Sequence, residues 1–175
     1  MCGLTGFFLP KPSSFEPGRI LEQMTNLLSH RGPDHQAVWS GKWGTRKYPR
    51  GSIHLGHRRL KILDLGESSN QPFFSSDGAL ILIYNGELYN FKELRDELQA
   101  LGHSFQTQGD TEVVLTAFLE WKTDCFTKFN GMWALAILDL EQQQLILSRD
   151  RFGEKPLYYH WDSENFIFGS EIKSL

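Results

Sequence analysis

The chain begins MCGLTGFF, so a cysteine occupies position 2 and a glycine follows it. A thiolate is a strong nucleophile, and an α-amine, with a pKa of about 7.7–8.0, can accept the thiol proton when both groups belong to one residue. Cys2 would reach that state if Met1 were removed, and no separate histidine base would then be required. The plain alternatives are that Cys2 is a buried residue of a first strand or part of a targeting signal. Cys125 is interpreted as a small core residue.

Five other clusters of polar residues occur along the chain, and each has an ordinary structural interpretation. Asn85-Gly86 is the strongest short signal for a type I′ hairpin turn. Arg58 and Arg59 suit a solvated strand face, and Asp110 suits the N-cap of a helix. The clusters are HRGPD (30–34), HRRL (57–60), YNGELYN (84–90), GDTE (109–112) and RDRFGEKPLYY (149–159), the last of which suits a tight glycine turn between two core strands.

The six histidines do not have the spacing of a metal site. His54 and His57 are three residues apart on a predicted strand, where the period of two places their side chains on opposite faces. No cluster of cysteines and histidines accompanies them. We therefore expect no metal in this domain and interpret the histidines as core or surface residues.

The elements that must position these residues can be predicted from the apolar spacing. Cys2–Leu9 suits a strand that is buried on both faces. Apolar residues at helical spacing predict a helix over about Gly18–Ser29. Further strands are predicted at Ser52–Leu63 and at Ala79–Tyr84 because both segments are rich in β-branched and apolar residues.

The second half of the chain predicts two helices and then a run of strands. In NFKELRDELQALGH, Asn90 and Glu93 form a capping-box pattern, and Gly102 is expected to end the helix. Another helix is predicted to open at Asp110-Thr111-Glu112, where acidic side chains suit the positive end of the helix dipole. From Met132 onward the segments MWALAILDL, LILSRD, PLYYHW and NFIFGS read as antiparallel strands. This order of elements indicates an α+β layered domain.

Length and composition exclude several classes of protein. A chain of 175 residues that is 40% hydrophobic can bury a full core as one domain. Its net charge is −3 and it has no basic run, so nucleic acid is not an expected partner. No stretch approaches the roughly 20 apolar residues of a membrane span, and Leu4–Leu9 is too short for a targeting signal. Two cysteines without a secretion signal predict a cytoplasmic protein.

Taken together and in this order, the MCG start and the five clusters resemble the glutaminase domain of class II glutamine amidotransferases across essentially the whole chain. Within that family, the chain is most similar to the N-terminal part of glutamine-hydrolysing asparagine synthetases. The resemblance implies an N-terminal-nucleophile hydrolase fold, with four layers in the order α, β, β, α and two stacked antiparallel sheets. It also implies that Met1 is removed and that Cys2 attacks the side-chain amide of glutamine.

The same resemblance implies roles for individual positions. Attack on an amide develops negative charge on its oxygen, which must be met by hydrogen-bond donors; the Asn85 side chain and the Gly86 backbone N–H match the family's donors. Arg59 matches the arginine that pairs with the α-carboxylate of glutamine. Asp110 matches the acidic residue that accepts the α-ammonium, and Glu87 is expected to be a further substrate contact.

The HRGPD cluster is implied to be a loop that borders the site, with His30, Arg31 and Gly32 behind the residues that contact substrate. Gly109 departs from the family pattern, which commonly has Ser or Thr before the aspartate. This difference is expected to remove a hydroxyl contact and to leave the carboxylate in place. Arg58 receives no functional role.

We therefore expect residues 1–175 to form a single domain that hydrolyses L-glutamine to glutamate and ammonia through a γ-glutamyl thioester on Cys2, without a cofactor of its own. The final segment, SEIKSL, resembles a boundary between domains. A synthetase domain, in cis or in trans, is expected to bind ATP and Mg²⁺ and to use the ammonia to amidate aspartate; a homodimer of the full-length protein is one open arrangement. The alternatives are a glutaminase that feeds a different acceptor and a non-catalytic scaffold or glutamine sensor.

Overall fold

The computed structural model describes residues 1–44, 49–62, 64–162 and 165–175. In this part of the chain the strands form two antiparallel sheets. In spatial order, the five-stranded sheet contains β2 (His35–Gly44), β3 (Pro49–Arg59), β1 (Gly3–Leu9), β9 (Phe166–Gly169) and β8 (Tyr158–Trp161). The four-stranded sheet contains β4 (Phe73–Phe74), β5 (Leu80–Leu88), β6 (Gly131–Asp139) and β7 (Gln144–Arg149).

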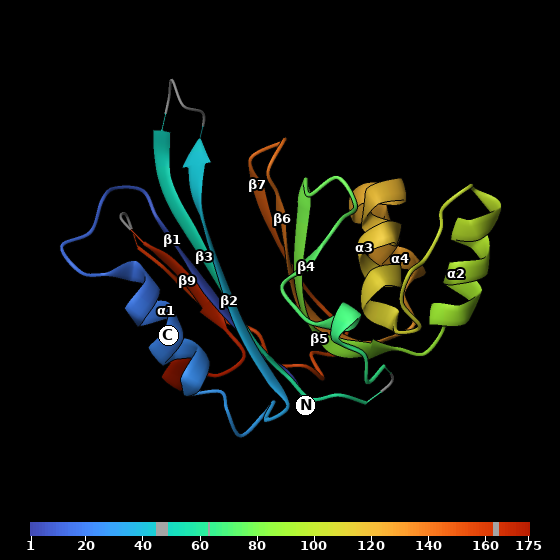
Figure 1. Cartoon of the computed structure of the whole chain (residues 1–175), viewed down its shortest axis with the longest axis horizontal. Helices are drawn as coiled ribbons and strands as arrows, with labels where there is room; N and C mark the ends of the chain where they lie inside the picture. Colours follow the sequence, from blue (N-terminus) through green and yellow to red (C-terminus); the bar gives the residue numbers. More distant parts are fainter. Residues whose placement is uncertain (45–48, 63, 163–164) are drawn as a thin grey trace.

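Helices cover the outer faces of both sheets (Figure 1). Helix α1 (Pro17–Asn26) packs on the five-stranded sheet, while α2 (Phe91–Ala100), α3 (Asp110–Trp121) and α4 (Cys125–Lys128) lie on the side of the four-stranded sheet. Short 3-10 turns occur at Glu67–Ser69, Lys122–Asp124 and Ile172–Ser174. The layers therefore follow the predicted order α, β, β, α, and the predicted α+β fold with two stacked antiparallel sheets is confirmed.

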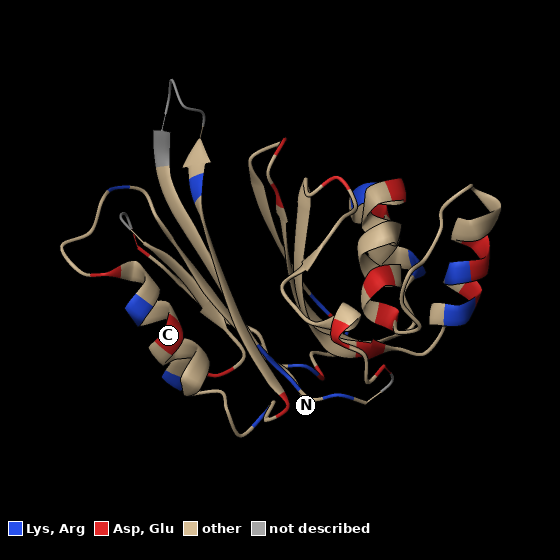
Figure 2. Ribbon diagram, viewed as in Figure 1, with Lys and Arg blue, Asp and Glu red and all other residues tan. Residues whose placement is uncertain are grey.

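Three apolar layers hold these elements together. The middle layer fills the gap between the sheets and includes Leu4 of β1, Leu55 of β3 and Ile83 of β5. A second layer joins the four-stranded sheet to its helices and contains the fully buried Cys125, as predicted. A third joins α1 to the outer face of β1. Charged residues lie mainly outside these layers, and Figure 2 shows acidic and basic residues mixed along α2.

The predicted helices are present, although two details of their ends differ. The helix expected over Gly18–Ser29 spans Pro17–Asn26 and continues into turns. Gly102, at a φ of 99°, follows the end of α2 as predicted. The capping box is wrong, because the Asn90 side chain makes no bond to its own helix and instead contacts the backbone of Lys128 and Asn130.

The predicted strands are also present, with one omission. The segment predicted as a strand over Ser52–Leu63 contains most of β3, which ends at Arg59; Leu63 lies outside the described residues. The sequence did not predict β2, whose HQAVWSGKWG segment contains two glycines and alternates poorly, and which is specified by antiparallel pairing along β3. The RDRFGEKPLYY cluster does contain a tight turn, with Gly153 at a φ of 67°, but it connects β7 and β8 of different sheets, and β8 is exposed rather than part of the core.

Candidate active site

A cavity of about 200 Å³ opens at one end of the gap between the two sheets. Its walls bring together residues from the N-terminus, β3, β5, β6, the segment before α3 and the turn after β7. The lining residues are Met1, Cys2, Arg59, Leu60, Ile62, Asp64, Ser69, Gln71, Tyr84, Asn85, Gly86, Glu87, Gly109, Asp110, Thr111, Met132 and Lys155. All six residues to which we assigned catalytic or substrate-binding roles line this one cavity.

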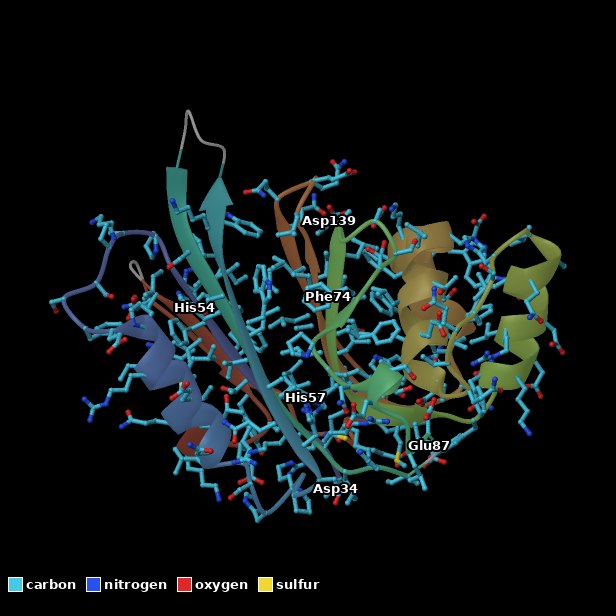
Figure 3. The ribbon with its side chains drawn as sticks, in the orientation of Figure 1. Asp34, His54, His57, Phe74, Glu87 and Asp139 are labelled. Carbon is cyan, nitrogen blue, oxygen red and sulfur yellow. The ribbon has the colours of Figure 1, made fainter. Side chains whose placement is uncertain are left out.

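The period of two along the strands explains why the site lies at this end. On β3 the inner face runs from the core residues Ile53 and Leu55 to His57 and Arg59. On β5 it likewise changes from apolar residues to Asn85 and Glu87. The inner faces of the two strands thus become polar at the same end of the sandwich, where Figure 3 labels His57 and Glu87.

Cys2 lies directly before β1 and beside Arg59. The pairing of Gly3 with Arg58 and of Leu4 with His57 brings the start of β1 next to the end of β3. The Cys2 sulfur accepts a hydrogen bond from the Leu60 N–H at 3.3 Å. Burial raises the pKa of the Cys2 thiol, and the Leu60 N–H and the positive charges of the N-terminus and Arg59 oppose that rise.

Met1 precedes Cys2 in this structure, so the α-amine belongs to Met1 and the Cys2 nitrogen is a peptide amide. An amide nitrogen cannot accept a thiol proton at neutral pH. Met1 also lines the cavity, and more than half of its surface is exposed. Removal of Met1 would give Cys2 an α-amine of its own beside the thiol.

Asn85 and Gly86 do not form a hairpin turn, so that interpretation is wrong. They continue β5, with Asn85 paired to Ala134 and Gly86 paired to Trp133. The Asn85 side chain is buried, and its Nδ2 has no hydrogen-bond partner among the described residues. A buried donor without an acceptor is costly, which is why such groups are usually explained by a ligand or by water.

The backbone N–H of Gly86 is directed to the free edge of β5. The N–H groups two residues before and after it, those of Tyr84 and Leu88, donate to the side chains of Gln71 at 2.6 Å and Asp110 at 3.0 Å on that edge. Since backbone N–H groups two residues apart in a strand point the same way, the Gly86 N–H lies between these two bonds, beside the cavity. A Cβ at this position would stand 2.4 Å from the Tyr84 ring, so only glycine fits here.

Arg59 is buried, in contrast to the solvated strand face that its sequence context also allowed. Its Nη1 donates to the carbonyl of Gly66 and to Asn70 Oδ1, both at 2.7 Å, and its Nη2 donates to the carbonyl of Asp64. A guanidinium has five N–H donors, so two of them are not used by these three acceptors. The loop from Asp64 to Asn70, which accepts these bonds, fixes the plane of the Arg59 guanidinium. The two N–H donors that the loop does not use are suited to a carboxylate.

Asp110 lies across the cavity at the start of α3 and does not cap it. Gly109 is the N-cap residue, and no side chain caps this helix. Instead, Asp110 Oδ2 accepts hydrogen bonds from the Tyr84 hydroxyl at 2.9 Å and from the Leu88 N–H at 3.0 Å. Burial raises the pKa of Asp110 above its ordinary value, and these two bonds oppose that rise.

The HRGPD loop borders the site from the side of β1. Arg31 Nε donates to the carbonyl of Cys2 at 2.9 Å, and Arg31 Nη1 and His30 Nε2 both bind Glu171. Although burial acts in the opposite direction, hydrogen bonds from Arg31, His30 and Lys173 lower the pKa of Glu171 to about 2. Gly32 packs against the backbone of β3, as a Cβ there would stand 2.4 Å from the carbonyl carbon of Arg58.

Sequence reasoning missed several residues of the cavity. The Asp64 carboxylate accepts from the Gly66 N–H, the Ser69 hydroxyl and the Gln108 N–H, so it holds the loop that binds Arg59 to the segment before α3. These hydrogen bonds lower the pKa of Asp64. Lys155 is also a lining residue, brought there by the turn around Asp150. The only signal for Asp64 in the sequence was a lone acid in an apolar segment, ILDLG.

His54 and His57 lie on opposite faces of β3, as predicted. His54 stacks on Phe7 on the α1 side, at 4.5 Å between ring centroids, whereas His57 points between the sheets. Within the described ranges, no group of three or more His, Cys, Asp or Glu residues could hold a metal ion. No helix in the same ranges is long and apolar enough to cross a membrane.

Comparisons with known proteins agree with this geometry. Residues 1–175 match a family model described as a glutamine amidotransferase domain. The chain is 40% identical over 180 residues to asparagine synthetase [glutamine-hydrolyzing] 3 of Bacillus subtilis, covering 100% of this chain and 27% of that protein. It is 36% identical over 189 residues to a putative asparagine synthetase [glutamine-hydrolyzing] 2 of Methanocaldococcus jannaschii, covering 100% of this chain and 35% of that protein. The chain thus spans about a quarter to a third of the length of these curated relatives.

The fold also matches a solved structure. Glutamine phosphoribosylpyrophosphate amidotransferase from B. subtilis, complexed with ADP and GMP, superimposes with a TM-score of 0.78 at 22% sequence identity. The match covers 99% of this chain and 42% of that one. At this identity, the likeness supports the fold and nothing more specific.

Proposed function

The chain belongs to the family of glutamine amidotransferase domains, and from this premise we propose that it hydrolyses L-glutamine to glutamate and ammonia with Cys2 as the nucleophile. The observation that carries the proposal is the convergence of Cys2, Arg59, Asn85, Gly86 and Asp110 on one cavity. These residues come from separate segments of the chain. Their chemistry suits a nucleophile, two hydrogen-bond donors for an oxyanion, and binding partners for the α-carboxylate and the α-ammonium of an amino-acid substrate.

Removal of Met1 prepares the chain for the reaction because it gives Cys2 a free α-amine. This amine takes the thiol proton, and the sulfur attacks the side-chain amide carbon of glutamine. Collapse of the tetrahedral intermediate breaks the C–N bond, and the proton passes to the departing nitrogen, which leaves as ammonia. Water then attacks the γ-glutamyl thioester, and glutamate and the free thiol are formed. The amine acts as base in both steps and as acid when each leaving group departs.

Negative charge builds on the carbonyl oxygen in both tetrahedral intermediates. Asn85 Nδ2 and the Gly86 N–H supply the two donors, and both belong to β5, a strand paired along its length with β6. Donors on a rigid strand need little reorganisation when charge develops, which is the main source of stabilisation in such sites. The unpartnered Asn85 Nδ2 supports this assignment because a bound oxyanion would satisfy it.

The charged end of glutamine is held between Arg59 and Asp110. The α-carboxylate pairs with the two N–H donors of Arg59 that its loop does not use. The α-ammonium pairs with Asp110 through Oδ1, while Oδ2 stays bonded to Tyr84 and Leu88. Glu87, which is half-buried in the same wall, is a further contact for the ammonium. Amides without both charged groups would bind more weakly.

The rest of the proposed function concerns protein beyond this chain. We propose that residues 1–175 form one glutaminase domain, and that its ammonia is used by a synthetase domain in cis or in trans. Two similar proteins carry the name asparagine synthetase, which supports aspartate as the acceptor. ATP and Mg²⁺ would then act in that synthetase domain. A different acceptor is distinguished by assaying the partner for asparagine formation from aspartate, ATP and ammonia.

The first test is the intact mass of the chain before and after treatment with diazo-oxo-norleucine, an electrophilic analogue of glutamine. We expect loss of Met1 and one adduct, mapped to Cys2. Cys125 is the matched control because it is buried in the helix layer, so Cys125→Ala should still be labelled and Cys2→Ala should not. Ammonia release from glutamine at the wild-type rate by Cys2→Ala would overturn the nucleophile, whereas Met1 loss without labelling would favour a glutamine-binding scaffold.

A further inference from the structure

His57 makes a hydrogen bond that joins the two sheets beside the cavity. Its side chain is fully buried, and its Nε2 lies 3.0 Å from the carbonyl oxygen of Tyr84. His57 belongs to β3 of the five-stranded sheet, and Tyr84 belongs to β5 of the four-stranded sheet. The Gly44 N–H also donates to Gln143 Oε1, which joins β2 to the turn after β6 at the end of the sheets away from the cavity. The contacts in the middle apolar layer are non-directional, so at the cavity end the His57 bond can specify a relative position that they cannot.

The chemistry of the bond determines which nitrogen carries the proton. A carbonyl oxygen only accepts, so Nε2 must be the protonated nitrogen. Burial, with a contribution from the charge of Arg59, lowers the pKa of His57 to about 3, so the ring is neutral at ordinary pH. Nδ1 is then a bare acceptor, and it has no partner among the described residues. One N–H, directed at one carbonyl, is what this buried ring contributes.

Both ends of the bond lead directly to residues of the proposed site. Arg59 lies two residues beyond His57 on the same face of β3. In the pairing of β3 with β1, the partner of His57 is Leu4, which lies two residues after Cys2. The residue after Tyr84 is Asn85, whose Nδ2 would meet the oxyanion. The bond therefore connects the strand pair that holds the nucleophile and the carboxylate site to the strand that holds the oxyanion donors.

We infer that His57 is a positioning residue: by holding the carbonyl of Tyr84, it sets the place of the Asn85 amide relative to the Cys2 sulfur. The inference rests on the proposed function for its effect on rate. Oxyanion donors act only within a narrow distance of about 2.7–3.1 Å, and a misplacement of about 1 Å can cost about 100-fold in rate. Substrate affinity depends on Arg59 and Asp110, so the effect is expected in kcat rather than in KM.

A matched pair of substitutions tests the inference. In His57→Gln the amide nitrogen can reach the position of Nε2 and keep the bond, whereas in His57→Asn it ends near Nδ1 and cannot. His54→Asn is the control, because His54 is nearly as buried on the other face of the same strand and, among the described residues, its side chain bonds Ser40 and Ser52, away from the gap. Figure 3 labels both histidines, with His57 at the site end of the gap.

Ammonia release from glutamine is measured for each variant after Met1 removal, together with the side-chain amide resonances of Asn85 by NMR. We expect kcat to fall about 10- to 100-fold in His57→Asn with KM changed by less than about threefold. His57→Gln and His54→Asn should stay within about fivefold of the wild type. Both substitutions of His57 remove the ring current of the imidazole, so the Asn85 amide resonances should shift in both variants and should shift further in His57→Asn than in His57→Gln.

The outcomes separate this inference from the proposed function. If the wild type is active and the Asn and Gln variants of His57 have equal kcat, the positioning role is wrong while the glutaminase assignment stands. If the wild type releases no ammonia, the proposed function fails, and Asn85 resonances that shift no further in His57→Asn than in His57→Gln would still overturn the positioning role. If His57→Asn does not fold, His57→Gln decides: retained kcat supports the inference and loss of kcat contradicts it.

Discussion

Replacing Asn85 with alanine should separate catalysis from stability, because its Nδ2 is buried yet makes no hydrogen bond among the described residues. Loss of one oxyanion donor costs about 2.7–4 kcal/mol of transition-state stabilisation, or about 100- to 1,000-fold in kcat. KM should change little, since Arg59 and Asp110 hold the charged end of glutamine. The expected signature is therefore a fall in kcat and kcat/KM together.

The same substitution should leave the free energy of unfolding almost unchanged. Removing an unsatisfied buried donor relieves a desolvation cost of about 1–3 kcal/mol. The small cavity left by the amide opposes this gain by about 1 kcal/mol or more. The two terms have opposite signs and similar size, so we expect a net change within about 1 kcal/mol.

Ammonia release under saturating glutamine measures kcat, and urea unfolding of the same samples measures stability. Asn90→Ala is the matched control, because Asn90 bonds the backbone of Lys128 at 3.0 Å and Asn130 at 2.9 Å away from the cavity. It should lose about 1–2 kcal/mol of stability at an unchanged kcat. An Asn85→Ala protein with wild-type kcat, or one that loses more than about 2 kcal/mol of stability, would refute the reasoning.

Three further predictions follow from the contacts of the site. Burial raises the pKa of Asp110 above 3.8, so kcat/KM should fall as the pH falls through that raised pKa and the carboxylate is protonated. Asp110→Asn should lose this acidic fall in kcat/KM and raise KM about 10- to 100-fold in steady-state kinetics. If the acidic fall remained in Asp110→Asn, it would have to come from another group. Although burial acts in the opposite direction, hydrogen bonds from Arg31, His30 and Lys173 lower the pKa of Glu171 from 4.5 to about 2, so its ion pairs stabilise the fold above pH 4.5. Because His30 and Lys173 are half exposed and solvent screens their charges, this contribution should be about 1 kcal/mol. It should be lost between pH 4.5 and 2 in urea titrations and be missing from Glu171→Gln; equal pH profiles for both proteins would contradict this. Gly86→Ala should lower stability by about 1–3 kcal/mol because its Cβ would stand 2.4 Å from the Tyr84 ring and 2.5 Å from the backbone oxygen of Met132. Gly18→Ala, on an exposed helix position with no atom within 4 Å of the new Cβ, should instead raise stability. A stable Gly86→Ala would show that both the ring and the Met132 backbone can move aside.

The local signals of the sequence were sufficient to predict an α+β layered domain because they agree with one another, whereas the four-layer order came from the resemblance to class II glutamine amidotransferases. The helical spacing of apolar residues identifies α1, and the apolar runs identify β5 and β6, without reference to the rest of the chain. The features that failed are those in which a local signal competed with a tertiary partner. Asn90 has the sequence of a helix cap, yet the backbone of Lys128 and Asn130 takes both ends of its amide. The β2 strand has weak local preference and forms because β3 offers a complete ladder.

The sequence by itself determined which side chains are available for chemistry: a thiol at position 2, an amide at 85, a guanidinium at 59 and a carboxylate at 110. It could not tell an Asn-Gly turn from a strand, or a helix cap from a carboxylate that lines a cavity, because both members of each pair have the same local pattern. Only the tertiary structure decided these cases. The pairing of β5 with β6 keeps Gly86 in a strand, and the Tyr84 hydroxyl and Leu88 N–H turn Asp110 toward the cavity rather than toward its own helix. The reason is physical: a short segment sets its own dihedral preferences, while the partner of each buried polar group is supplied by segments distant in the sequence.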